Sequence, residues 1–157
     1  MPSRYLAAAL AAALLPGGMA LAHHGVSGLY DTSRPIALTG VVTAARFAPP
    51  HPVISIRVEN AAVPAGDLGR PDEITGPIAV RDEDVGQVRE VEFSPMRIFY
   101  ELNAELRPGD RVTVVALRNC RPPHQLRSSW IRLPDGETVS YDGGLHRRAD
   151  GCPTSRS

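Results

Sequence analysis

The sequence predicts an all-β fold with one short helix, a small closed barrel of the OB type, with a β-sandwich as the alternative. Two neighbouring segments, 36–47 and 53–60, alternate apolar and polar residues with a period of two, as half-buried strands do. Counting such segments gives five or six strands with one helix between the third and the fourth, which is the OB order. The chain also has 15 Pro and 14 Gly, and small all-β domains are similarly rich in turns.

The first strand is expected over Ile36–Phe47 and the second over Val53–Asn60. Gly40 lies inside the first strand, where a residue without a Cβ usually marks a bulge or a sharp bend. The connection Pro49-Pro50-His51-Pro52 places one imidazole between prolines, whose φ angles are fixed by their rings. We therefore expect a β-hairpin or β-corner with a stiff, histidine-bearing tip.

A long loop over 61–87, with a short strand at 78–81, should lead into a third strand over 88–93. Ser94 and Pro95 then read as the N-cap and first residue of a helix of two or three turns. The turn Arg107-Pro108-Gly109-Asp110 ends this helix.

Three strands follow the helix, over Arg111–Arg118, Arg127–Leu133 and Thr138–Tyr141, the last two joined by the turn Pro134-Asp135-Gly136. The alternation predicts inward-facing side chains for a set of apolar residues. They are Ile36, Leu38, Val42, Ile54, Ile56, Val58, Phe93, Val112, Val114 and Ile131. The barrel domain is thus expected over residues 23–142, with a polar tail over 143–157.

Residues 1–22 have the pattern of a cleaved Sec-type signal peptide. Arg4 supplies the positive charge, Leu6–Leu15 is an apolar run of ten, and Ala20 and Ala22 are the small residues before the cleavage site. The run is too short to span a bilayer, so no stable membrane anchor is expected. The prediction is export to the periplasm with a mature start at His23; the alternative is a buried N-terminal helix.

Cys120 and Cys152 are the only two cysteines. In an oxidising compartment an even count of two predicts one disulfide, which would tether the tail to the end of a strand. A metal site with two thiolates is the alternative, but the chain lacks CxxC spacing.

Charge and motifs exclude several functions. The 17 basic residues, all Arg, balance 17 acidic ones, so there is no field of one sign to attract nucleic acid or an anionic membrane. The spacings GxSxG, HExxH and GxGxxG and the P-loop motif are missing, so we predict no enzyme. Glu90, Glu92 and Glu101 are expected on solvated faces, and Tyr100 and Trp130 as packing or rim aromatics.

The histidines carry the one candidate metal site. Cleavage after Ala22 would free the α-amine of His23, which with its imidazole can chelate one ion; a second imidazole would complete a nitrogen-rich site suited to Cu(II). His51 is the best second ligand because its prolines restrain it, and His24 is the weaker candidate. In the alternative reading the His-His pair has no role and His51 only packs. His124 and His146 are expected in surface loops.

Several motifs together resemble a family of small exported bacterial proteins of unknown function. These are AHHG after the signal, YDTSRPIALTGVVT, a Pro-His pair before VISIRVE, LRPGDRVTV and LPDGETV, covering about residues 23–141. The family typically has AHHS, Leu-Thr-Gly-Thr-Val, Asn-Pro-His, Lys-Pro-Gly-Asp and Leu-Pro-Asp-Gly-Arg at these places. This chain departs from it with Pro50 in place of Asn, an acidic insertion and the cysteine pair. The resemblance implies an OB-like periplasmic domain and no established activity.

The expected function is therefore that of a periplasmic binding or accessory module for a small ligand or an unknown envelope partner, without catalytic activity. OB-type folds bind through one face and its loops without supplying chemistry of their own. A copper-binding protein is the second expectation and a hydrolytic enzyme a distant third.

Overall fold

A computed structural model of the chain describes residues 28–59, 62–66, 68–70, 73–143 and 148–153. The strands are β1 Tyr30–Arg46, β2 Val53–Val58, β3 Val88–Phe93, β4 Arg111–Asn119, β5 Leu126–Arg132, β6 Thr138–Ser140 and β7 Arg148–Ala149. The helical segments are the 3₁₀ turn η1 Asp82–Asp84, the helix α1 Arg97–Glu101 and the 3₁₀ turn η2 Leu102–Ala104. No helix of these ranges is long and apolar enough to cross a membrane.

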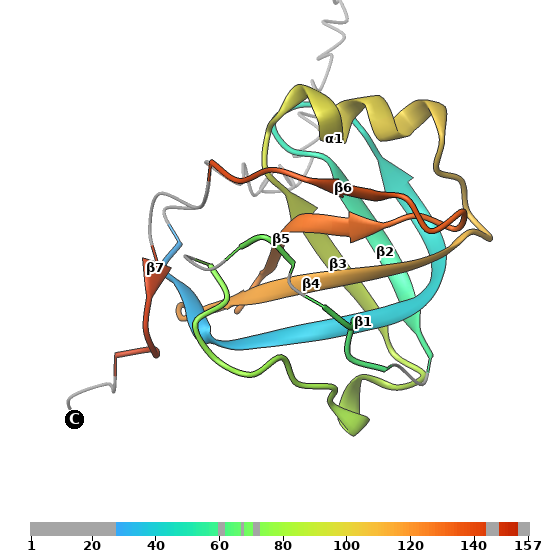
Figure 1. The fold of residues 1–157 in the computed structure, drawn as a ribbon. Coiled ribbons are helices and arrows are strands. Elements are labelled where there is room, and N and C mark those ends of the chain that lie inside the picture. The colour runs from blue at the N-terminus through green and yellow to red at the C-terminus, as the bar shows by residue number, and fades with distance from the viewer. Residues whose placement is uncertain (1–27, 60–61, 67, 71–72, 144–147, 154–157) are drawn as a thin grey trace, which may run out of the picture.

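Five strands close into a mixed barrel in the order β1–β2–β3–β5–β4, with β4 returning to β1 (Figure 1). Every pairing within the barrel is antiparallel except β3 with β5, which is parallel. The strands β6 and β7 add to β5 and β1 from outside the barrel. This closed barrel, with its short helix between β3 and β4, confirms the predicted OB-like fold.

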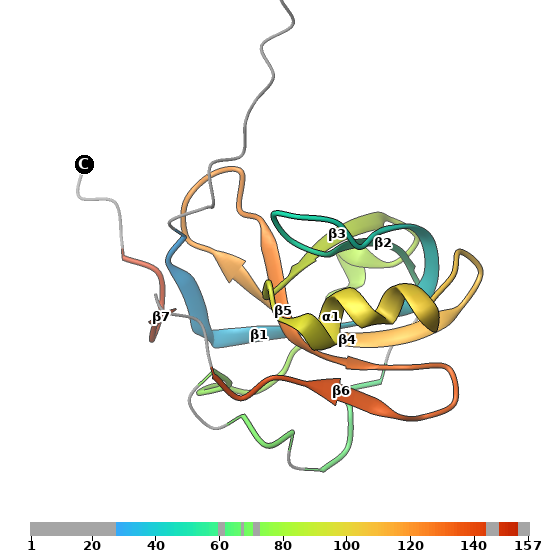
Figure 2. The ribbon, with the colours of Figure 1, turned by 90° about the horizontal axis from the view of Figure 1, so that it is seen from above.

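The interior of the barrel is filled by the apolar side chains that the alternation predicted. All ten residues expected to face inward are buried, with exposures of 4% or less. The helix α1 lies across one end of the barrel, as Figure 2 shows, and its Phe99 ring packs against Phe93 with the ring centroids 5.0 Å apart. Aromatic burial of this kind is among the largest contributions to a small core.

Strand β1 is longer and less regular than the sequence indicates. It begins at Tyr30, six residues before the predicted start, because its pairing with β4 resumes beyond an irregularity between Asp31 and Ile36. A second irregularity between Val42 and Ala44 shifts the register with β2. The shift reverses which face each side chain occupies: Ala44 is exposed and Ala45 packs on the core.

Gly40 permits the close approach of two strands. It pairs with Val58 of β2 and with Val112 of β4, at the place where β1 passes from one partner to the other. The bulge itself lies further along, after Val42. A Cβ built at Gly40 would lie 2.0 Å from the backbone oxygen of Arg57, and that oxygen belongs to a strand that is fixed by pairing on both sides.

Gly40→Ala is therefore expected to destabilise the barrel by about 1–3 kcal/mol or more, as overpacking does. Chemical denaturation of the two proteins measures the difference. Ala44→Gly is a suitable control, because it changes the same strand at an exposed position. Equal stability of Gly40→Ala and the unsubstituted protein would contradict the close approach.

The helix start and the tail differ from expectation. The helix begins at Arg97 with Met96 as its N-cap residue, so the predicted N-cap at Ser94 was wrong; there the backbone oxygen of Ser94 accepts from the N–H of Met96 instead. The tail, expected to be loose, forms β7 within its described part, and β7 pairs in parallel with Tyr30 and Asp31.

Candidate functional site

His51 occupies the tip between β1 and β2, as predicted, and reaches charged groups on two other strands. Its Nδ1 lies 3.1 Å from Nη2 of Arg127 on β5 and 3.4 Å from Oε1 of Glu92 on β3. The His51 side chain is 14% exposed. The tip itself is held by Tyr100 of α1, whose hydroxyl donates to the backbone oxygen of Pro50 over 2.9 Å. The imidazole therefore has a defined position in a charged environment.

Glu92 and Arg127 lie opposite each other on the parallel strands β3 and β5, and their charged groups approach to 3.5 Å. The exposures of these side chains are only 8% and 12%. The amide of Gln125 donates a short hydrogen bond to the second carboxylate oxygen of Glu92. Glu92 points away from the barrel interior, as the alternation predicted, but the expectation that it is solvated was wrong.

Tyr30 and Asn119 extend this group of residues onto β1 and β4, where they are register partners. The guanidinium of Arg127 lies over the Tyr30 ring, 5.8 Å from its centroid, within the range of a cation–π contact. Burial raises the pKa of the Tyr30 hydroxyl; Arg127 lowers it, through its charge and its close approach to the hydroxyl, and the charge of Glu92 raises it.

We call these six residues the polar cluster: Tyr30, His51, Glu92, Asn119, Gln125 and Arg127. Five of their side-chain atoms are shielded from solvent and have no hydrogen-bond partner. They are Tyr30 Oη, Glu92 Oε1, Asn119 Nδ2, Gln125 Oε1 and Arg127 Nε. Of these, Glu92 Oε1 lies within ion-pair distance of His51 and Arg127 but accepts no hydrogen bond. Unpaired buried polar atoms are rare in native proteins, and each one costs stability. Such a concentration at one place marks the polar cluster as the candidate functional site.

The contacts also assign the proton on His51. A guanidinium donates hydrogen bonds and cannot accept them, so Nδ1 of His51 is the acceptor in its contact with Arg127. A neutral imidazole with an accepting Nδ1 carries its proton on Nε2. For Nδ1 to donate a hydrogen bond to Glu92, the hydrogen bond from Arg127 to Nδ1 must first break.

The predicted metal ligands are only partly within the described structure. His23 and His24 lie outside the described residues, as does His146. Within the described ranges, no group of three or more His, Cys, Asp and Glu side chains is arranged to hold a metal ion. His124 lies in the β4–β5 loop with a φ of 62°, and its Nδ1 is 3.0 Å from the backbone oxygen of Asn119.

The aromatic and cysteine predictions have clear outcomes. Trp130 is a packing residue with 3% exposure, and the guanidinium of Arg132 lies 5.2 Å from its ring centroid. Cys120 and Cys152 form the predicted disulfide, with their Cα atoms 5.2 Å apart.

The raised pKa of Tyr30 gives a testable pH dependence. The folded protein holds the phenolic proton more tightly than the unfolded chain, so Tyr30 favours folding below pH of about 10 and this contribution is lost at higher pH. Tyr30→Phe should leave stability at pH 7 little changed, because the hydroxyl has no hydrogen-bond partner. It should also reduce the loss of stability in alkali. Denaturation at several pH values measures both effects; identical alkaline profiles would contradict the assignment.

Fold and site together define a small OB-like barrel with a nearly buried charged cluster beneath its β1–β2 tip. Residues 12–67 are similar to a family described as "Family of unknown function (DUF6152)". The matched segment includes β1, the tip with His51, and β2. No curated protein matches the chain.

Proposed function

We propose that this protein is an exported, non-catalytic binding module that recognises a small polar ligand, or a partner presenting the same groups, at the polar cluster. The observation that carries the proposal is the group of five unpaired buried polar atoms. The cluster also lies where the β1–β2 tip approaches the β4–β5 region, and OB-type barrels bind ligands through these two loops.

The unpaired atoms define the ligand's chemistry. Arg127 Nε and Asn119 Nδ2 are donors, Glu92 Oε1 and Gln125 Oε1 are acceptors, and the Tyr30 hydroxyl is both. A matching ligand therefore offers acceptors and donors together, as amides, amino acids and hydroxy acids do. Of the three residues His51, Glu92 and Arg127, His51 and Arg127 are the more exposed. The ligand would therefore enter between them.

The partners of His51 support a role in binding. His51 contacts Arg127 and Glu92 among the described residues, and neither of these is a nucleophile that an imidazole activates. The carboxylate and the guanidinium neutralise one another across β3 and β5. This arrangement supports a role in positioning polar groups for a ligand.

Nuclear magnetic resonance tests the binding proposal directly. A panel of small amides, amino acids and hydroxy acids would be titrated while the arginine Nε–H signals are followed. We expect at least one compound to shift the Arg127 Nε–H signal and to lose affinity about tenfold or more in Arg127→Gln, since hydrogen bonds of charged groups have that magnitude. Arg97→Gln is the matched control, because Arg97 is exposed on α1. An equal loss of affinity in both variants would contradict the site.

Copper binding is the second candidate, and one observation favours it. Gly28 packs against Tyr30 and Asn119: a Cβ there would lie 2.5 Å from Asn119 Nδ2. The described chain thus begins beside the polar cluster, and the five residues back to His23 span at most about 18 Å. His23 and His51 would supply the nitrogens, with His24 as the weaker alternative to His51.

Arg127 separates the two candidates experimentally. If copper binds Nε2 of His51, the imidazole proton must move to Nδ1. The Nδ1–H group would then donate a hydrogen bond to Glu92, as in a carboxylate–histidine–metal triad. Arg127 opposes this, so Arg127→Met should tighten copper binding and abolish binding of the polar ligand. Copper titration followed by electron paramagnetic resonance, with His51→Ala and an N-terminally extended form beside it, checks the site. Equal copper affinity in the extended and processed forms would contradict a role for the α-amine of His23.

Export is part of the proposal and has a separate test. The disulfide supports it, because such bonds persist in oxidising compartments such as the periplasm. The intact mass of protein recovered from the periplasm should correspond to a chain beginning at His23. Any other start would remove the basis of the copper candidate and leave the polar-ligand proposal unaffected.

A further inference from the structure

A concave site lies beside the disulfide, apart from the polar cluster. It is a pocket of about 630 Å³ formed by the start of β1, the segment 77–81, Arg118 of β4 and the tail residues Cys152 and Pro153. This volume falls within the usual range for small-molecule sites. No residue of the polar cluster lines the pocket, so its test is independent of the function proposed above.

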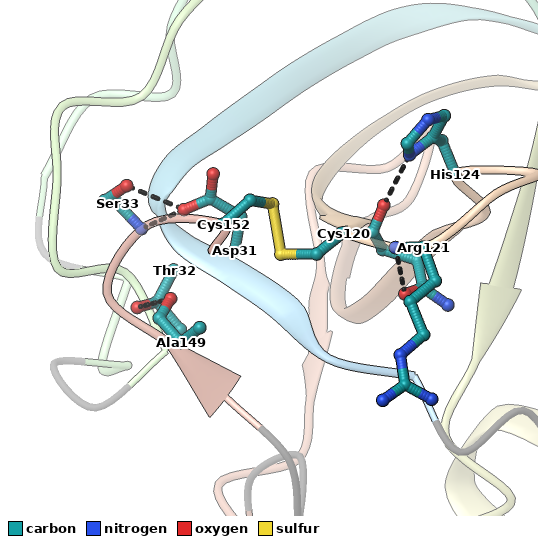
Figure 3. The surroundings of a disulfide bond; sticks show 9 residues. Asp31, Thr32, Ser33, Cys120, Arg121, His124, Ala149 and Cys152 are labelled. Carbon is teal, nitrogen blue, oxygen red and sulfur yellow. Dashed lines mark hydrogen bonds between the residues drawn. A yellow bond between two sulfur atoms is a disulfide. The ribbon is translucent and has the colours of Figure 1, made fainter. Parts of the chain in front are cut away.

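Hydrogen bonds and the disulfide fix the walls of this pocket. Figure 3 shows the disulfide joining the tail to the end of β4, with Asp31 and Ser33 of β1 beside it. The Thr32 hydroxyl donates to the backbone oxygen of Ala149 over 3.0 Å. A pocket held in this way loses little conformational freedom when a ligand binds, which favours affinity.

The segment 77–81 is fastened to β1 in a similar manner. The N–H of Ala37 donates to the oxygen of Ala79, and the N–H of Ala79 donates to the oxygen of Pro35, both over 2.9 Å. Gly76 approaches the backbone of Ser33 so closely that a Cβ would lie 2.0 Å from the Ser33 oxygen. Three parts of the chain that are distant in sequence therefore meet at the first residues of β1.

The lining of the pocket is positively charged. Arg34, Arg81 and Arg118 line it against a single carboxylate, that of Asp31. Arg81 is paired with Asp84 over 2.6 Å. Arg34 and Arg118 are exposed, and neither has an ion-pair partner among the described residues.

Asp31 does not neutralise these two arginines. One oxygen of its carboxylate accepts from the N–H of Ser33 over 3.0 Å and from the Ser33 hydroxyl over 2.6 Å. Asp31 and Arg118 are register partners on neighbouring strands, yet they form no ion pair. Two guanidinium groups thus remain available to an anion from solvent.

The remaining lining is apolar, from Ile36, Pro77, Ala79 and Pro153. Aromatic residues are missing from the lining, so the pocket has no platform on which a nucleobase would stack. Guanidinium groups recognise carboxylates and phosphates through paired hydrogen bonds. An apolar wall next to them adds affinity for an attached hydrocarbon group.

We propose that this pocket binds a small organic anion, a carboxylate or phosphate attached to a short hydrocarbon body. Arg34 and Arg118 hold the anionic group. Ile36, Pro77 and Ala79 contact the apolar body, and the disulfide-bonded tail closes one side.

Calorimetric titration of the full chain with its disulfide intact tests the proposal. The probes are octanoate and octyl phosphate, both below their micellar concentrations. Acetate and inorganic phosphate serve as anions without the hydrocarbon chain, and octanol serves as the hydrocarbon chain without the anionic group. Octanoate or octyl phosphate should bind at least about tenfold more tightly than either the matching small anion or octanol, because both parts of the pocket contribute.

Variants assign the binding to this pocket. Arg34→Gln with Arg118→Gln should weaken the binding of the amphiphilic anion about tenfold or more. Arg57→Gln is the control for the loss of one positive charge elsewhere, since Arg57 is exposed on β2; it is compared with each single variant as well as with the double variant. Ala79→Trp should block the pocket. Thermal unfolding of each variant confirms that it folds.

Several results would overturn the proposal. These are undetectable binding of both amphiphilic anions, octanol binding as tightly as octanoate, and an equal loss of affinity in Arg57→Gln and the double variant. Binding to vesicles of anionic phospholipid without binding to the monomeric probes would also overturn it, because the recognised object would then be a lipid surface.

Discussion

Replacement of both Cys120 and Cys152 by serine is expected to lower the free energy of unfolding by about 3–4 kcal/mol. The two residues are 32 positions apart, and opening a loop of that length restores this amount of chain entropy to the unfolded state in the entropic model of disulfide stabilisation. The melting temperature should fall by roughly 10–15 °C for a domain of this size. The tail should also lose β7, because two residues of parallel pairing are a weak attachment without the covalent link.

Thermal unfolding of three samples measures this effect: the unsubstituted protein, the same protein with reductant, and the double serine variant. The reduced protein and the variant should agree. Because Cys152 and Pro153 form part of the pocket wall, both samples should also bind the octyl anions more weakly. A loss of stability below about 1 kcal/mol would show that pairing and packing alone hold the tail.

The barrel was predictable because its interior follows the strand period. Ile54, Ile56 and Val58 alternate strictly in β2, and each is buried. The beginning of β1 was not predictable, because Thr32, Ser33 and Pro35 interrupt the alternation. Its pairing depends on β4 and β7, which lie far away in sequence.

The candidate site was predictable only at His51, which its flanking prolines distinguish. Glu92 and Arg127 are ordinary outward positions of β3 and β5, and nothing in either segment indicates that they are nearly buried. Their proximity depends on the parallel pairing that closes the barrel. One general feature could have indicated this proximity: closing an OB-like barrel pairs the third strand with the fifth. Once the register of that pairing is known, Glu92 and Arg127 are opposite each other.

The charged residues of the polar cluster could contribute to the stability of the fold or to ligand binding. Substitution of Glu92 and Arg127 distinguishes these two roles. Either single change, Glu92→Leu or Arg127→Leu, is expected to cost about 3–5 kcal/mol, because it leaves the opposite charge in a nearly buried place without its partner. In Glu92→Leu, His51 also loses its carboxylate.

The double variant should behave differently from either single variant. Two leucines facing each other on β3 and β5 remove both charges together, and apolar replacement of a buried ion pair is often neutral or stabilising. Two of the five unpaired atoms, Glu92 Oε1 and Arg127 Nε, are removed by these substitutions, while Gln125 Nε2 loses its acceptor on Glu92. We expect a stability within about 1 kcal/mol of the unsubstituted protein, hence a large coupling energy in the double-mutant cycle.

Denaturation of the four proteins at one pH gives the cycle, and titration with the panel of polar compounds gives the corresponding loss of binding. A stable double variant without binding would show that the cluster is maintained for recognition. A double variant as unstable as the sum of its parts would show that Glu92 and Arg127 contribute separately to folding. In that case the unpaired atoms around them would no longer support a ligand site. Arg97→Leu with Glu101→Leu is the matched control, because it removes an exposed ion pair on α1 in the same way.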